Sequence, residues 1–403
     1  MEEPTEDILN GGEHPLLDAH ARRRGLLFLA LASALVGVAL AIQSGLKENF
    51  LVEEIGVTAF QRGFVEAARE LCGILALLVL AVLAGFAEPM VAIAMLMVTA
   101  VGFSGYFFAG YGEFTFLVIM SMIWSQGLHV WMPLPNSMAI AMAEPDRVGY
   151  RMGQVRGAGA AGYAIGLVLA LLLTWLTVGM RPMYLVAAGV IVVGALFYLG
   201  IPRNIKTPGP RLVFKRRYFL YYVLCFLEGW RKQIFMCFAG FLLVKDHGTG
   251  LSTILLLRIS VQAAGYFAFP IVGKIIDHLR ERTILIFYYG CLTVFFIGYA
   301  FIPDKRVLYA LFVVDNAFFV FAMSIETYVG RIAPKRELTP TLSMGVAVNH
   351  VAAVIMPLAG GILWYAFGYQ YAFLLGALAA AVSVLIVAVW MPKKLAPATA
   401  DDD

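Results

Sequence analysis

Apolar runs of about twenty residues, the length a helix needs to cross the hydrocarbon of a bilayer, recur along nearly the whole chain. Short polar turns separate them. The pattern predicts twelve membrane-spanning helices, at about residues 25–43, 60–84, 90–111, 114–141, 157–177, 182–200, 218–244, 252–275, 283–302, 307–329, 341–366 and 370–391. The expected fold class is an all-α polytopic membrane protein.

The composition agrees with this pattern. Of 403 residues, 61% are hydrophobic and 14% are charged, which is more apolar side chain than the core of a soluble protein could hide. The polar stretch before the first span has a late basic cluster, and no small-residue cleavage site follows a short apolar core. We therefore expect the first helix to stay as an anchor in an integral membrane protein that contacts the lipid bilayer.

The basic residues predict the orientation. Of the 30 lysines and arginines, 20 fall in turns and tails on the side of the N-terminus, six fall on the other side, and four lie inside predicted spans. Loops rich in Lys and Arg stay in the cytoplasm. We therefore expect both termini to be cytoplasmic, in a cytoplasmic (inner) membrane. The four basic residues inside spans are Arg69, Arg231, Lys232 and Arg258.

One connector is both long and polar: "IPRNIKTPGPRLVFKRR", residues 201–217, which divides the spans into six and six. The expected organisation is a cytoplasmic tail (1–24), a six-helix bundle (25–200), a cytoplasmic linker (201–217), a second six-helix bundle (218–391) and a cytoplasmic tail (392–403).

The two halves read as repeats. The turns "AEPDRVGYRMG" and "APKRELTPTLSMG" follow the fourth and tenth spans, and both run through Ala, Pro and Arg to Met-Gly. Arg69 precedes Glu88 by 19 residues, and Arg258 precedes Asp277 by 19 residues. The two bundles are therefore expected to be pseudo-symmetric.

The segment "GKIIDHLRER", residues 273–282, and the later segments "RIAPKRELTPTLSMG" and "MPLAGGILWYAFGYQYAF" resemble the major facilitator superfamily, over about residues 25–391. The resemblance implies two six-helix halves that rock about a central site by alternating access, with helices 1, 4, 7 and 10 lining the cavity. It also implies a gating latch formed by Gly273, Asp277 and Arg282. The glycines of "RGAGAAGYAIG", residues 156–166, are expected to allow close helix packing.

The span "FLEGWRKQIFMCFAGFLLV", residues 226–244, carries three charges, and each costs about 3 kcal/mol at the bilayer centre. Glu228, Arg231 and Lys232 share one wall of the helix, about 100° wide. Both cations can reach the carboxylate, at i+3 and i+4, which leaves one net positive charge. We therefore expect this wall to face a watery cavity or the other half. The stretch "EAARE" of the second span repeats the pattern with one net negative charge.

The intramembrane polar residues supply the candidate substrate-binding set. Its cations favour an anionic or zwitterionic solute, while the competing interpretation is that these charges pair between spans and hold the fold together. The set comprises Arg231, Lys232, Glu228, Arg69, Arg258, Gln262, Gln126, Trp124, Asp315, Asn349 and His350.

These features predict a secondary active transporter for a small polar, anionic solute. Its partners would be that solute and, as an open question, a coupling proton or other ion, with the protein as a monomer. One alternative is a proton-coupled efflux pump for lipophilic compounds, which predicts an apolar, aromatic cavity. Another is a transport-inactive receptor or scaffold.

Other function classes lack their signatures. The sequence shows no phosphate-binding loop, zinc-type His-Glu spacing or nucleophile–His–acid set, so we expect no enzyme, no catalytic residues and no cofactor. It shows no nucleic-acid motif, and its four cysteines form no C-x-x-C pair. We expect neither disulfides nor a bound metal.

Overall fold

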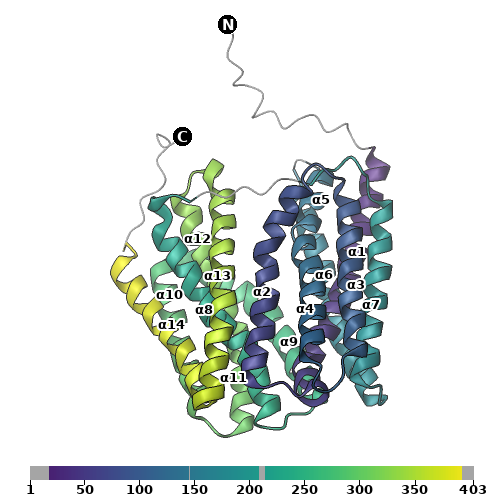
Figure 1. Cartoon of the computed structure of the whole chain (residues 1–403). Helices are drawn as coiled ribbons and strands as arrows, with labels where there is room; N and C mark the ends of the chain where they lie inside the picture. Colours follow the sequence, from purple (N-terminus) through teal and green to yellow (C-terminus); the bar gives the residue numbers. More distant parts are fainter. Residues whose placement is uncertain (1–17, 145, 208–213, 393–403) are drawn as a thin grey trace.

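The computed structural model describes residues 18–144, 146–207 and 214–392, apart from the side chains of Phe269, Asp277, Lys335 and Arg336. Nearly all of this part of the chain is helical, and the one β-bridge within it joins Ala87 to Lys206. The helices stand side by side, and α1 begins on the same side of the molecule toward which α14 ends (Figure 1). An all-α polytopic fold is confirmed.

The elements of the first half are α1 (Ala19–Asn49), η1 (Phe50–Ile55), α2 (Ala59–Val82), α3 (Glu88–Phe108), α4 (Phe114–Trp131), α5 (Leu134–Met142), α6 (Val148–Trp175), α7 (Met180–Phe197) and η2 (Tyr198–Gly200). In this half α1 packs against α6 and α7 and runs without a break into a π-helical segment, η1. The fourth predicted span is divided into α4 and α5 next to Pro133, which cannot donate a backbone hydrogen bond.

The second half repeats this arrangement. Its elements are η3 (Arg216–Tyr218), α8 (Phe219–Lys245), α9 (Leu251–His278), α10 (Glu281–Phe301), α11 (Lys305–Phe318), η4 (Phe319–Ala322), α12 (Met323–Ile332), α13 (Lys335–Phe367) and α14 (Tyr369–Trp390). The tenth predicted span of the chain is divided into α11, η4 and α12.

Ten helical segments of the described chain are long and apolar enough to cross a membrane. Helices α2 and α8 complete the predicted set of twelve: both have the length, but charged residues lower their apolar character. Their assignment as spans stays a prediction that rests on their place between neighbouring spans. Each of the predicted spans coincides with one of these helices or divided helices.

The end of the first span and the placement of two basic residues differ from the prediction. We expected the first span to end near residue 43, and we counted Lys47 and Arg62 among the six basic residues of the outer side; both expectations are wrong. Helix α1 extends to Asn49, and Arg62 lies inside α2 with its side chain fully buried. The hydrophobic run stops before the helix does, because the polar residues of the last turn are paired inside the protein.

Gly162 and Gly166 of the predicted stretch pack closely against α1, whereas a Cβ atom at Gly157 would meet nothing within 4 Å. A Cβ atom added at Gly162 would collide with the backbone of Ala34, and one at Gly166 with the backbone of Val38. Small residues let two helix backbones approach within a membrane, where packing rather than the hydrophobic effect drives association.

Polar contacts join the two halves on the side away from the chain ends. Asn49 Nδ2 donates to the carbonyl oxygen of Thr249 at 3.0 Å, and Lys245 Nζ donates to that of Val57 at 3.4 Å. Helix α2 runs beside α13 (Figure 1), and Gly63 lies against the carbonyl of Pro357. The structure is therefore closed on this side.

The described parts of the linker are attached to both halves. The backbone N–H of Thr207 donates to the carbonyl of Phe86 at 2.9 Å in the turn between α2 and α3. On the other side of residues 208–213, which lie outside the description, Lys215 and Arg217 donate to Glu337 of α13 at 2.6 and 2.5 Å.

Candidate functional site

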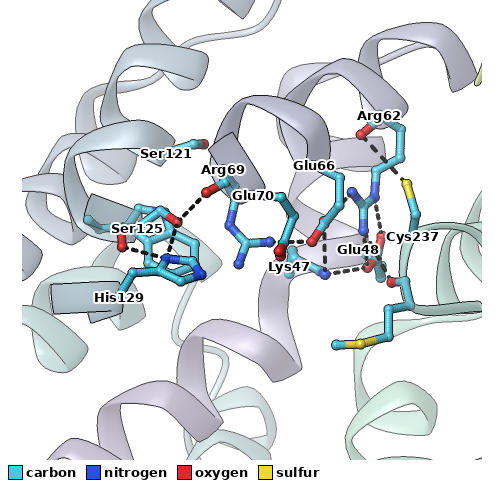
Figure 2. A network of polar contacts seen from close by, with 12 residues as sticks. Lys47, Glu48, Arg62, Glu66, Arg69, Glu70, Ser121, Ser125, His129 and Cys237 are labelled. Carbon is cyan, nitrogen blue, oxygen red and sulfur yellow. Dashed lines mark hydrogen bonds and ion pairs between the residues drawn. The ribbon is translucent and has the colours of Figure 1, made fainter. Parts of the chain in front are cut away.

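A chain of ion pairs joins the last turn of α1 to the first half of α2; we call it the N-terminal charge network (Figure 2). Arg62 donates through Nε and Nη2 to both oxygens of Glu48, at 3.1 Å each, and through Nη1 to Glu66 at 2.7 Å. Glu66 also accepts from Arg69 Nη1 at 2.6 Å. Lys47 Nζ completes the network, 3.3 Å from Glu48 and 3.7 Å from Glu66.

The network is compensated. Lys47, Arg62 and Arg69 supply three positive charges, and Glu48, Glu66 and the neighbouring Glu70 supply three negative ones. The side chains of Arg62, Glu48 and Glu66 are all at most 2% exposed. Charges buried this deeply are stable only when they are paired and hydrogen-bonded, so the network fixes how α1 and α2 lie against each other.

Arg69 connects the network to helix α4. Its guanidinium lies over the ring of Trp124, 4.4 Å from the ring centroid. Trp124 is itself buried and donates through Nε1 to Tyr106 Oη at 3.2 Å. These contacts give both predicted site residues, Arg69 and Trp124, a structural role as a cation–π pair.

The charges of α8 form a second group, the C-terminal charge cluster, which consists of Glu228, Arg231, Tyr288 and Asp315. Arg231 is fully buried and hydrogen-bonds to Glu228 and, at 2.9 Å, to Tyr288 Oη. Its Nη1 lies 3.7 Å from Asp315 Oδ1, on α11. Arg231 therefore has two carboxylate partners within its own half.

This arrangement corrects the expected pairing on α8. Lys232 was expected to reach Glu228, but it donates instead to Asn349 Oδ1 of α13 at 3.2 Å. Asn349 in turn donates to the carbonyl of Cys225 at 3.2 Å. The surplus positive charge on α8 therefore belongs to Lys232, whose partner among the described residues is a neutral amide.

Two more predicted residues have no direct partner in the described part of the chain. Arg258 is half-buried on α9 and makes no ion pair or hydrogen bond there, and its Nε is buried. The buried Nε2 of Gln126 on α4 also lacks a hydrogen-bond partner among the described residues. The matching positions of Arg69 and Arg258 in the two halves led us to expect that they face each other across the pseudo-twofold axis, but the described contacts include none between them.

An open cavity of about 440 Å³ lies between α1, the junction of α4 and α5, α6 and α9. Gln262, a predicted site residue, reaches it from the second half. Arg156 lies on its wall and donates through Nε to Asn136 at 3.1 Å. The full lining is Ser33, Val36, Gly37, Leu40, Trp131, Met132, Pro135, Asn136, Val155, Arg156, Gly159, Ala160, Tyr163 and Gln262.

The cavity lies toward the side of the chain ends, away from the contacts that close the halves together. Its lining residues come from the middle of α1, the first half of α6, the junction of α4 and α5 and the middle of α9, so the cavity extends from mid-depth toward the chain ends. The charges of α8, expected at the substrate site, are not part of this lining.

The two halves also meet at His350 of α13. Its Nδ1 lies 3.0 Å from Glu70 Oε2 of α2, and its ring packs against that of His129 of α4. His350 thus lies between the halves, as expected of a central residue. The pairing with Glu70 could not be read from the sequence, because 280 residues separate the two.

The predicted latch is described only in part. The side chain of Asp277 lies outside the described residues. Arg282 donates to the carbonyl of Ala388 at the end of α14, at 2.7 Å. A Cβ atom added at Gly273 would meet nothing within 4 Å. The latch assignment stays a prediction.

Sequence reasoning missed Lys47, Glu48 and Arg62 in the network and Arg156 in the cavity. A signal for Arg62 was present, because it precedes Glu66 by four residues, the spacing of a helical ion pair. Glu48 gave no such signal, since its partner lies on another helix. Arg156 falls near the end of a predicted span, where a basic residue suits a cytoplasmic turn equally well.

Comparison with known proteins agrees with this architecture. The family model described as Major Facilitator Superfamily matches residues 27–325. No curated protein matches the sequence.

Several solved structures share the fold. The nucleoside transporter NupG superposes with a TM-score of 0.74 at 14% identity, covering 91% of this chain and 99% of that one. A bacterial homologue of the human lysosomal transporter Spinster, inward-facing and unoccupied, gives 0.73 at 13% identity, covering 94% and 100%. A D-xylose–proton symporter gives 0.70 at 14% identity, covering 92% and 98%. The family match extends over most of the chain and its two six-helix halves superpose on transporters of that fold, so this integral membrane protein belongs to the Major Facilitator Superfamily of transporters.

Proposed function

We propose that the protein is a secondary active transporter of a small polar, anionic solute, which enters the cavity from the side of the chain ends. The main support for the proposal is the positive charge of the cavity lining. Arg156 is the one charged residue of its described lining, and no carboxylate lies there to neutralise it. An anion would supply the missing charge.

Polar neighbours around Arg156 favour recognition of a hydrogen-bonding solute. Asn136, Tyr163 and Gln262 place amide and hydroxyl groups on the same walls. Gln262 comes from the opposite half, so a solute that contacts Arg156 and Gln262 together would connect the two halves. This is the position a substrate needs if it is to couple binding to rocking of the halves.

Unpaired cations lie beyond the cavity as well. Arg258 precedes Gln262 by one helical turn on α9 and makes no hydrogen bond or ion pair in the described chain, although Glu48 is a more distant charged neighbour. Lys232 contacts a neutral amide. Most of the other charges are already paired, so these two and Arg156 are the cations we assign to the solute. The predicted roles of Arg231, Glu228 and Asp315 then become structural support of the second half.

Apolar side chains favour one alternative. Val36, Leu40, Trp131 and Met132 also line the cavity, which suits efflux of a lipophilic compound. A lone arginine in such a wall suits a lipophilic anion better than a lipophilic cation. The orientation with cytoplasmic termini in an inner membrane, a monomeric state and a coupling proton or other ion remain parts of the proposal.

The test is a ligand screen followed by a matched pair of variants. Purified protein is heated with anionic, neutral and cationic compounds, because a ligand of the folded state stabilises it by mass action. For an anionic ligand found in this way, Arg156→Gln should weaken binding by about 1.5–3 kcal/mol, or at least tenfold, the scale of a charge-assisted hydrogen bond.

Arg151→Gln on the same helix is the control. Arg151 lies outside the cavity lining, and its hydrogen bonds to Glu144 lower the pKa of that carboxyl to about 2. Its removal should leave the ligand affinity unchanged. Stabilisation by cationic compounds alone, or equal affinity in the wild type and Arg156→Gln, would refute an anionic substrate and favour the lipophilic alternative.

A further inference from the structure

Three metal-ligating side chains from three helices converge where the halves meet. Glu70 of α2, His129 of α4 and His350 of α13 each offer a ligand atom, and these atoms lie within 4.8 Å of one another. The two imidazole rings have centroids 5.5 Å apart and planes at 70°. His350 already contacts the carboxylate of Glu70.

Two histidines and one carboxylate are a ligand set that first-row transition metals use, and three protein ligands leave a position open. Tetrahedral metal–ligand bonds of about 2.0–2.2 Å place two ligand atoms of one ion about 3.3–3.6 Å apart. The observed group therefore needs to contract by at most about 1.5 Å, which side-chain rotation on neighbouring helices can provide.

The hydrogen bonds of His129 leave its free nitrogen available to an ion. Its Nδ1 lies 2.8 Å from the carbonyl oxygen of Ser125, which can only accept a hydrogen bond. Nδ1 therefore carries the proton, and Nε2 keeps its lone pair. A ligating histidine typically donates its other N–H to a backbone carbonyl in this way, which fixes both the tautomer and the ring orientation.

Gly73 makes room for the two rings. A Cβ atom at this position would lie 2.6 Å from His350 Cε1 and 3.1 Å from His129 Cδ2. Any larger residue would push the imidazoles apart. A neighbouring cation, Arg69, hydrogen-bonds to Glu66 at 2.6 Å rather than to Glu70.

We propose that Glu70, His129 and His350 bind one divalent transition-metal ion, such as Zn²⁺, between the two halves. Because Glu70 and His129 belong to the first half and His350 to the second, the ion stabilises the arrangement in which α2 and α13 touch at this level. The site goes beyond transport of the solute and replaces the expectation from sequence that no metal is bound. That expectation followed from the absence of a spacing motif, and these ligands are brought together only by the fold.

The experiment uses the full chain, purified and treated with a chelator, then titrated with Zn²⁺ by calorimetry and with Co²⁺ by visible absorption. We expect one ion per chain. His129→Gln and His350→Gln should each lower Zn²⁺ affinity by about 100-fold or more, above the 10–100-fold typical of losing an outer-shell partner.

His129→Gln is the decisive variant, because the hydrogen bonds of His129 among the described residues stay within its own half and its loss should leave the fold intact. His278→Gln, at the exposed end of α9, is the control and should bind Zn²⁺ as the wild type does. Absence of stoichiometric Zn²⁺ binding, or unchanged affinity in His129→Gln, would overturn the proposal. A Co²⁺ spectrum that persists in both histidine variants would do the same.

Discussion

Replacing Arg62 by glutamine should destabilise the protein more than any surface change. The guanidinium is fully buried and makes three hydrogen bonds to Glu48 and Glu66. Glutamine fills part of the space, but only Lys47 and Arg69 then remain to neutralise the carboxylates of Glu48, Glu66 and Glu70. Removing one partner of a buried ion pair costs about 3–5 kcal/mol, mostly because the remaining charge is buried without compensation.

The measurement is the free energy of unfolding from a denaturant titration. Arg181→Gln is the matched control, because Arg181 also pairs with a glutamate, Glu54, at 2.9 Å, but both side chains are 31% exposed. An exposed pair of this kind contributes about 0–1 kcal/mol.

A double variant separates lost packing from uncompensated charge. If charge is the cause, Glu48→Gln in the Arg62→Gln background should recover part of the lost stability, because it removes one of the uncompensated carboxylates. The reasoning is refuted if Arg62→Gln unfolds as easily as Arg181→Gln, with a cost below about 1 kcal/mol.

Three further predictions follow from the structure. Arg231→Gln should lower the free energy of unfolding by about 3–5 kcal/mol. Lys232→Gln should change it by less than about 1 kcal/mol, because the partner of Lys232 is a neutral amide. Equal losses of stability in the two variants would contradict the assignment of Lys232 to the solute. Single cysteines in place of Arg203 and Lys305, both exposed, should react with an impermeant reagent from opposite sides of the membrane, and labelling from one side would refute the topology. Gly162→Leu should prevent α6 from packing on α1 and reduce the yield of folded protein, and normal yield would argue against close packing there.

The sequence was sufficient for the architecture because that information is local. Each span is a continuous apolar run, and the lipid allows its backbone to form only a helix. The loop signature around Gly273 and the matching turns after the fourth and tenth spans were enough to predict the family. The ends of α1 were predicted less well, because Lys47 and Glu48 look like loop residues until their partners on α2 are known.

The site was harder to predict because its partners are distant in sequence. The charged wall of α8 was expected to face a watery cavity or the other half, but its charges contact α10, α11 and α13 of their own half. Helical geometry alone could not show that Asp315 would lie near Arg231 or that Asn349 would bind Lys232. Periodicity tells which residues share a face and not which helix that face meets. Arg156 shows the same limit, since its exposure to a cavity depends on where α9 places Gln262.

The contacts between the halves lead to a last prediction, about rocking. Asn49 joins the halves by one hydrogen bond, to the backbone carbonyl of Thr249, and Arg62 adds one to the carbonyl of Met236 at 3.4 Å, while the ion pairs of Arg62 and Arg231 stay within their own halves. When the halves separate on the side away from the chain ends, individual hydrogen bonds to backbone carbonyls are replaced by hydrogen bonds to water. The ion pairs within each half are kept. Asn49→Ala should shift the equilibrium toward that opening by about 0.5–1.5 kcal/mol, the net contribution of one hydrogen bond.

The shift can be read from inside the cavity. Ala160 is an exposed residue of the cavity lining, so a cysteine there reacts while the cavity is open toward the chain ends. In the Asn49→Ala background its labelling should slow, because less of the protein is in the state described here. A cysteine at Arg203, on the surface in either state, should label at the same rate in both backgrounds. Equal labelling of Ala160→Cys with and without Asn49 would mean that this hydrogen bond does not hold the halves together, and that apolar packing between α2 and α13 does so instead.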